Sequence, residues 1–203
     1  MNWIEKIKNL TDAQFHYSKD SGSRIILEEI QESASCKEVI INKISKNFKT
    51  FTLALDKRKI ISKTKNPQEK DVSTDIHPLL ANGIEYLKKQ CDYVIFCQNN
   101  QELFVLLVEM KSNNSEGWTK QTYAGEHIAK YLLGMIENCL GMNIKKVNFR
   151  HILFSNQNAN AMKGRKKSKT STQEFKYETH PDFDFFYIRK PCNTDYDLGI
   201  FLR

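Results

Sequence analysis

Two strongly apolar segments separated by five polar residues constrain the fold of this chain more than any other feature. Residues 93 to 97 and 103 to 111 are short, apolar and rich in β-branched and aromatic side chains, and Gln-Asn-Asn-Gln-Glu lies between them. Short apolar runs bounded by turn-forming residues are typical of buried strands. The segment therefore predicts two adjacent antiparallel strands that form a hairpin.

Charged residues at the margins of these two strands form the candidate site. Strand side chains alternate between faces, so Glu109 and Lys111 are expected on the same face. If the hairpin is centred on Asn100 and Gln101, Asp92 falls opposite Glu109, with the two Cβ atoms roughly 5 Å apart. A loop with an odd number of residues would shift this register by one position and separate the two carboxylates.

Two facing carboxylates repel each other, but their proximity becomes favourable when a divalent cation binds between them. Mg²⁺ prefers oxygen ligands, and a lysine two residues further along can orient water or offset charge on a phosphate. Asp92, Glu109 and Lys111 are thus the parts needed for metal-assisted hydrolysis of a phosphodiester. The alternative is that Glu109 and Lys111 cap an ordinary strand and Asp92 is a turn residue.

The rest of the sequence predicts helices and strands around this hairpin. Apolar spacing indicates helices over 3–15, 24–33, 79–89 and 119–140, with Gly141 as the stop of the last. Strands are expected at 39–41, 147–155 and 183–190, and a hairpin with a charged turn at 48–62. No repeat or domain boundary is evident, so residues 1–203 are expected to form one domain. The class is α/β, bordering on α+β, with a mixed sheet flanked by helices.

Asp92, the hairpin, Glu109-Met110-Lys111 and the helix that follows resemble the PD-(D/E)xK nuclease superfamily, which includes many restriction endonucleases and repair nucleases. The resemblance covers a core of about residues 24–155 and implies a restriction-endonuclease-like fold. It implies that Asp92 and Glu109 bind metal, that Met110 offers its backbone carbonyl, and that Lys111 is the catalytic lysine. Cys91 stands where the family's name has proline.

The resemblance also implies further site residues and a cofactor. Many members add an acidic residue from the first core helix, and of Glu28, Glu29 and Glu32 we select Glu29, at the edge of that helix's expected apolar stripe. Gln121, early in the helix after Lys111, resembles a polar residue that some members aim at the site. The implied cofactor is Mg²⁺, with Mn²⁺ as a substitute, and the implied settings are restriction, defence or repair.

The net charge of +7 is concentrated in two segments. Residues 145–172 hold eight basic residues and no acidic ones, and residues 43–70 hold nine basic residues and two acidic ones. Such segments favour binding to a polyanion, with nucleic acid the leading candidate. A mobile basic loop is expected over 156–175, and its proposed nucleic-acid contacts are Lys163, Arg165, Lys166, Lys167 and Lys169. The alternative is a solvated, lysine-rich surface.

Several classes of protein are excluded or disfavoured by pattern. The longest strongly apolar run has six residues, far below the roughly 20 needed for a membrane helix, and no secretory signal is present. Five cysteines without a CxxC pair disfavour a disulfide framework and a zinc site, which favours a reducing cytoplasm. The P-loop motif is absent.

The sequence thus predicts a Mg²⁺-dependent nuclease that acts on nucleic acid, with DNA favoured over RNA. Its partners would be nucleic acid and a second copy or a larger defence or repair complex, with no membrane. One alternative is a catalytically inactive nucleic-acid-binding or scaffold subunit with the same fold. A third is a protein-interaction module whose basic segments bind an acidic partner.

Overall fold

Two mixed β-sheets and two α-helices make up the described part of the chain. The computed structural model describes residues 2–29, 33–44, 48–55, 90–99, 102–112, 116–144, 146–156 and 177–203. Within these ranges the helices are α1 (Trp3–Leu10) and α3 (Trp118–Leu140), and the sheets have six and three strands. The expected class, α/β bordering on α+β, is therefore confirmed.

The larger sheet has the strand order β3-β4-β5-β6-β8-β7. Its strands are β3 (Lys49–Ala54), β4 (Tyr93–Gln98), β5 (Leu103–Lys111), β6 (Val147–Ser155), β7 (Glu178–Thr179) and β8 (Phe186–Lys190). The strands β5, β6 and β8 are parallel, whereas β3–β4, β4–β5 and β7–β8 are antiparallel. Helix α3 connects β5 to β6, so the ends of these two strands and the start of α3 meet at one edge.

The smaller sheet has the strand order β1-β2-β9 and corrects one prediction. Its strands are β1 (Arg24–Glu28), β2 (Glu38–Asn42) and β9 (Thr194–Asp197), with β1–β2 antiparallel and β2–β9 parallel. The helix expected over 24–33 is wrong from its first residue, because residues 24–28 are a strand. Ile25 and Leu27 are both fully buried, which is the two-residue period of a strand face against the core.

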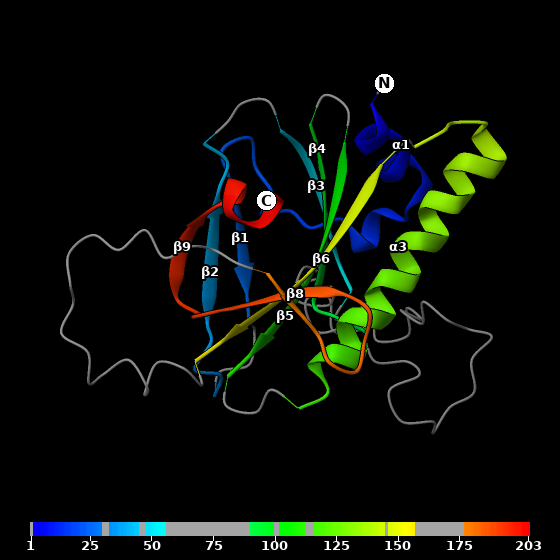
Figure 1. Ribbon diagram of the computed structural model, residues 1–203. Helices are drawn as coiled ribbons and strands as arrows, with labels where there is room; N and C mark the ends of the chain where they lie inside the picture. The colour runs from blue at the N-terminus through cyan, green and yellow to red at the C-terminus, as the bar shows by residue number, and fades with distance from the viewer. Residues whose placement is uncertain are drawn as a thin grey trace, which may run out of the picture.

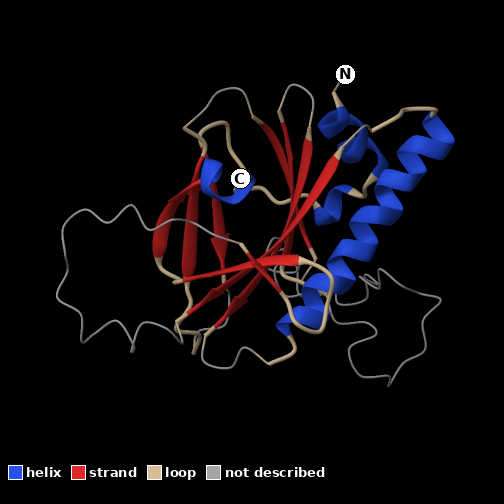
Figure 2. Ribbon diagram, in the orientation of Figure 1, coloured by secondary structure: helices blue, strands red, loops and turns tan. Residues whose placement is uncertain are grey.

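The larger sheet is the middle layer of the molecule. On one face, Tyr93, Leu106 and Ile152 pack with Ile25 and Val39 of the smaller sheet. On the other face, the side chains of β4 and β5 pack against α1 and α3. Figure 1 shows the three-stranded sheet and the two helices on opposite sides of the larger sheet, and Figure 2 separates the same layers by type.

Helix α3 is placed against the sheet by a glycine. A Cβ atom at Gly125 would lie 2.3 Å from the Sγ atom of Cys91, so only glycine permits this approach. The helix ends as predicted at Gly141, whose φ of 63° is left-handed. Helix α1 is held by Gln98 at the end of β4, whose Oε1 accepts hydrogen bonds from the backbone amides of Trp3 (2.8 Å) and Ile4 (3.4 Å).

The other predicted elements have mixed outcomes. The strand at Leu103–Lys111 is confirmed at both ends, and those at 39–41, 93–97 and 147–155 are confirmed within a residue or two. The strand expected at 183–190 is shorter, since it begins at residue 186. Residues 49–54 form β3, which pairs with β4, while the rest of the hairpin expected at 48–62 and the helix expected at 79–89 lie outside the described residues.

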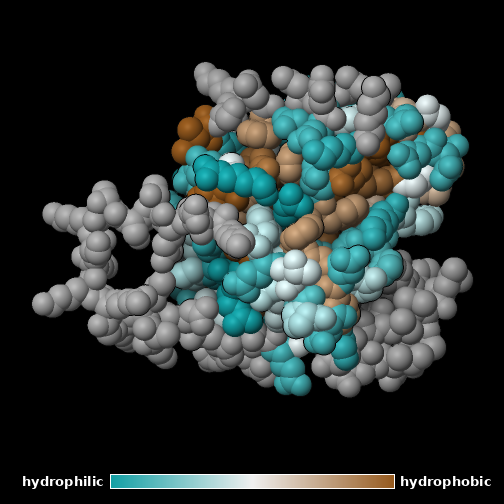
Figure 3. Space-filling view, viewed as in Figure 1, coloured by the Kyte–Doolittle hydropathy of each residue, from teal (hydrophilic) through white to brown (hydrophobic). Residues whose placement is uncertain are grey.

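The packed core extends beyond residues 24–155. Trp3 and Ile7 of α1 are buried against the larger sheet, and Tyr196 and Phe201 are buried between the sheets. On the face seen in Figure 3, apolar side chains gather in a band beside α3. Three partly buried residues of β6 and α3 that pack against this core are Leu132, Val147 and Phe149.

Candidate functional site

The predicted register of the β4–β5 hairpin is confirmed. Tyr93 pairs with Val108 and Gln98 with Leu103, which leaves a four-residue loop centred between positions 100 and 101. Continued by one position, this register places Asp92 opposite Glu109. A loop with an even number of residues thus places the two carboxylates opposite each other, as predicted.

Direct hydrogen bonds join Asp92 to Glu109 and to the backbone of Met110. The amide of Asp92 donates a hydrogen bond to Oε2 of Glu109 (3.2 Å), and the amide of Met110 donates one to Oδ2 of Asp92 (2.7 Å). Glu109 is 2% exposed and Asp92 is 6% exposed, so both carboxylates lie in the protein interior. Burial of two acidic groups is costly unless cations or hydrogen bonds offset their charge.

Lys111 supplies one such charge. Its Nζ lies 2.8 Å from Oε1 of Glu109, and its side chain is 24% exposed. The two residues are on the same face of β5, as the two-residue period predicts. The lysine therefore connects the buried carboxylates with the molecular surface.

The pKa of the Cys91 thiol is affected by the negative charges of Asp92 and Glu109. Burial raises the pKa of its thiol well above the usual value, and the charges of Glu109 and Asp92 raise it further. The thiol is the same group that α3 approaches at Gly125. It is therefore a neutral packing group between the helix and the carboxylates.

The donor set fits an oxygen-preferring divalent cation. The described residues contain no cluster of three or more histidine, cysteine or acidic side chains that could bind a metal ion. The candidate metal site is thus limited to Asp92, Glu109, the carbonyl of Met110 and water. Mg²⁺ usually keeps several waters and takes one or two carboxylates, so this small donor set suits it.

Glu29 does not occupy the helix expected for it. It directly follows β1, where its amide donates to the carbonyl of Lys37 (2.9 Å). Its neighbour Glu28 is tied to the hairpin, because the hydroxyl of Tyr93 donates to the Glu28 carbonyl (2.8 Å) and accepts from the Glu28 amide (3.1 Å). The end of β1 therefore contacts Tyr93 on the face of the larger sheet that packs against the smaller sheet, whereas Asp92 and Glu109 lie on the face towards α3.

Gln121 lies in the first turns of α3, beside the start of β4. Its Nε2 donates to the carbonyl of Gln90 (3.4 Å), two residues before Asp92. The Oε1 atom of Gln90 is buried and has no hydrogen-bond partner. Gln121 therefore lies at the rim of the site, with a backbone contact rather than a contact to the carboxylates.

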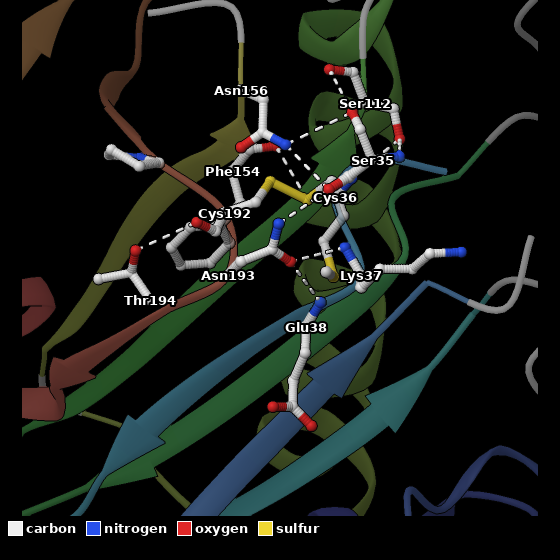
Figure 4. The surroundings of a disulfide bond; sticks show 12 residues. Ser35, Cys36, Lys37, Glu38, Ser112, Phe154, Asn156, Cys192, Asn193 and Thr194 are labelled. Atoms are coloured by element: carbon white, nitrogen blue, oxygen red, sulfur yellow. Dashed lines mark hydrogen bonds between the residues drawn. A yellow bond between two sulfur atoms is a disulfide. The ribbon is translucent and has the colours of Figure 1, made fainter. Parts of the chain in front are cut away.

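A network of polar residues surrounds the residue after Lys111 (Figure 4). The Oγ atom of Ser112 accepts hydrogen bonds from the amides of Ser35 (2.9 Å) and Cys36 (3.2 Å). The Nδ2 atoms of Asn156 and Asn193 both donate to the carbonyl of Ser35, at 2.9 and 2.8 Å. The segment before β2 is therefore fixed to the ends of β5 and β6.

A disulfide bond between Cys36 and Cys192 closes the same network (Figure 4). The bond corrects the prediction that disulfides are disfavoured, because an odd number of cysteines without a recurring spacing gives no sign of a pairing. Asn193 follows Cys192 with a φ of 54°, and its Oδ1 accepts from the amides of Lys37 (2.8 Å) and Glu38 (3.1 Å). The disulfide thus links β2 to the β8–β9 connection.

The predicted nucleic-acid contacts of the basic loop lie outside the described residues. They are Lys163, Arg165, Lys166, Lys167 and Lys169. In the other basic segment, Lys43 is a structural residue: its side chain is 5% exposed, and its Nζ contacts Asp20 (2.6 Å) and Thr50 (2.6 Å). Lys43 therefore does not contribute to a basic surface.

A buried cluster around Glu126 has little signal in the sequence. His151 is fully buried in β6, and its Nε2 lies 2.7 Å from Oε2 of Glu126 in α3. Lys130 lies 2.5 Å from the other carboxylate oxygen of Glu126. The spacing of Glu126 and Lys130, four residues apart on one helix, is the only local signal for this group.

Comparison of the chain with protein-family models, with curated proteins and with solved structures gives no match. Neither described helix combines the length and apolar character needed to cross a membrane.

Proposed function

We propose that the protein is a Mg²⁺-dependent nuclease of the PD-(D/E)xK type that hydrolyses phosphodiester bonds of nucleic acid. One observation carries the proposal: Asp92 and Glu109 meet at the ends of two buried strands, and Lys111 contacts Glu109 on the same face. Metal-assisted phosphoryl transfer needs carboxylates that can hold a cation and a nearby positive charge that can reach the phosphate. The two carboxylates and Lys111, which is 24% exposed, provide these groups.

Each residue has a separate role in this proposal. Asp92 and Glu109 would hold Mg²⁺, or Mn²⁺ in its place, together with the carbonyl of Met110. The ion, when bound, supplies polarisation of a phosphoryl oxygen and a lower pKa for water. Lys111 would turn from Glu109 towards the phosphate and offset the charge that develops on it.

Glu29 and Gln121 would act from the edges of the site. Both belong to segments that contact the beginning of β4, through Glu28 and Gln90. Their side chains would position substrate or water, and neither role requires a direct contact with the carboxylates.

The substrate would be DNA, recognised by the basic segment that holds Lys163 and Arg165. Restriction, defence or repair in the cytoplasm is the setting we propose, with a second copy or a larger complex as partner. A reducing cytoplasm would work against the Cys36–Cys192 bond, so the redox state of these cysteines inside the cell bears directly on the location.

A nucleic-acid-binding subunit without cleavage activity is a second candidate, and a specific contact favours it. Oε1 of Glu109 is paired with Lys111 and Oε2 accepts from the Asp92 amide, so both oxygens already have partners inside the protein. A site that keeps these contacts in the presence of Mg²⁺ would bind nucleic acid without cutting it.

Cleavage assays separate the two candidates. Wild-type protein is incubated with labelled plasmid, linear duplex and single-stranded DNA and RNA in Mg²⁺, in Mn²⁺ and in excess chelator. We expect cleavage in either metal, none in chelator, and loss of more than a hundredfold in rate for Asp92→Asn and Lys111→Met.

Lys130→Met is the matched control, because Lys130 is also paired with a glutamate, Glu126, and lies outside both basic segments. Its cleavage rate should equal that of the wild type. Cleavage by the wild type in excess chelator, or full activity of Lys111→Met, would refute the proposed mechanism.

A further inference from the structure

An arginine on β8 lies in the same row of the sheet as the candidate site. The strand register pairs Arg189 with Leu153 of β6, and Leu153 with Glu109 of β5. With Asp92 opposite Glu109, one row crosses four neighbouring strands. Neighbouring strands are about 4.8 Å apart, so the Cα atoms of Arg189 and Glu109 are roughly 10 Å apart.

Arg189 also shares the face of the sheet on which Glu109 and Lys111 lie. Ile188 packs into the core between the two sheets, so the residues on either side of it point to the opposite face, towards α3. Tyr187 confirms this, because it packs against Trp118 at the start of α3. Glu109 has the same direction, since Leu107, two residues before it, packs with α3.

The guanidinium of Arg189 has no acidic partner among the described residues, in contrast to several lysines of the protein. Lys111, Lys43 and Lys146 each form an ion pair with an acidic side chain. Arg189 forms none within the part of the chain that the structure describes, and its Nε is buried without a hydrogen-bond acceptor. The charge of the guanidinium is therefore not offset by an acidic side chain of the described residues, and an anion bound at the surface would offset it.

We propose that Arg189 binds a backbone phosphate of nucleic acid, next to the phosphate held at Asp92, Glu109 and Lys111. The inference rests on the proposed function, and it names a second subsite for the same strand. The guanidinium can hold two phosphate oxygens at once, whereas a lysine acts as a point charge. Leu153 separates Arg189 from the carboxylates in the row, so the arginine stays available for an external anion.

Binding measured without cleavage tests this subsite. Fluorescence anisotropy follows labelled duplex and single-stranded DNA in excess chelator at several salt concentrations. The variants are Arg189→Met, Arg189→Lys and the control Arg24→Met, which makes the same change at an exposed arginine of the smaller sheet.

We expect Arg189→Met to lower the affinity about tenfold for all sequences alike. The slope of log affinity against log salt should shrink by about 0.9 on duplex and about 0.7 on single strands. Arg189→Lys should keep the slope and lose part of the affinity, because the two-oxygen contact is lost. Arg24→Met should bind like the wild type.

The melting temperature distinguishes ligand binding from a structural role. Arg189→Met removes an unpaired buried donor, so its melting temperature should equal or exceed that of the wild type. An unchanged affinity and salt slope, or an affinity loss that accompanies a lower melting temperature, would overturn the inference. If binding depends on Arg189 but wild-type protein never cleaves, the proposed nuclease function fails and the subsite stands.

Discussion

Reduction of the Cys36–Cys192 bond should destabilise the protein strongly. The two cysteines are 156 residues apart in sequence, so the bond closes most of the chain into one loop. In the chain-entropy model a loop of this length restricts the unfolded state by about 5 kcal/mol. Since domains of this size are stable by only about 5–15 kcal/mol, the bond is a large part of the total.

The measured loss should be smaller than this upper value. The network at Ser35, Ser112 and Asn193 does not depend on the sulfur–sulfur bond and would persist after reduction. Cys36 and Cys192 are 0% and 4% exposed, so their thiols would stay packed. We therefore expect a loss of about 2–4 kcal/mol in the free energy of unfolding.

Urea unfolding followed by tryptophan fluorescence and circular dichroism measures this loss. Wild-type protein is compared with and without reductant, and the double variant Cys36→Ala/Cys192→Ala is compared in the same way. Reductant should lower the urea midpoint of the wild type and leave that of the double variant unchanged. Cys139→Ala, which changes an exposed free cysteine, should behave like the wild type.

Two results would refute this reasoning. The first is the same urea midpoint for oxidised and reduced wild-type protein at equal denaturant dependence. The second is mass spectrometry of unreduced, alkylated protein that finds all five cysteines as free thiols.

Three further predictions concern packing and charge. Gly125→Ala should lower the free energy of unfolding by about 1–3 kcal/mol, since the new Cβ would overlap the Cys91 thiol. Gly134→Ala on the same helix should raise it by about 0.5–1 kcal/mol, since the new Cβ would meet only the Asn138 side chain, at 4.0 Å. Urea midpoints check both changes. Lys43→Met should cost about 3–5 kcal/mol by thermal unfolding, because it strands the buried Asp20 carboxylate, and a loss under 1 kcal/mol would contradict this. Burial lowers the pKa of His151 below its usual 6.5 despite the nearby Glu126. Below pH 6.5 the unfolded state therefore binds more protons than the folded state, and the free energy of unfolding should fall as the pH drops. His151→Gln should flatten this dependence in unfolding experiments between pH 5 and 7.

The hairpin and its register could be predicted because both depend on local pattern. Two apolar runs and an even number of loop residues fix which residues face each other, and no distant part of the chain changes that count. Asp92 and Glu109 were therefore paired correctly from sequence alone. The long helix and its end at Gly141 were predicted for the same reason, since apolar spacing and a left-handed glycine are local signals.

The segment around Glu29 could not be assigned in this way. Residues 24–28 contain three adjacent apolar residues, and this run fits one turn of an amphipathic helix as well as a strand. Pairing with β2 and burial against the larger sheet decide the outcome, and both are contacts with distant residues. Glu29 consequently arrives from a strand end instead of a helix face.

The proposed role of Arg189 shows why a binding surface is harder to predict from sequence than a pair of candidate ligands. Its row is defined by three pairings, of which only β4–β5 is a hairpin; β5–β6 and β6–β8 are parallel and join segments far apart in sequence. No spacing in the sequence connects Arg189 with Glu109, 80 positions earlier. The carboxylates and Lys111 can be found from one hairpin, whereas the cation two strands away in the same row follows only from the assembled sheet. Candidate substrate contacts on the far strands of a mixed sheet should therefore be sought by register, from the candidate ligands outward.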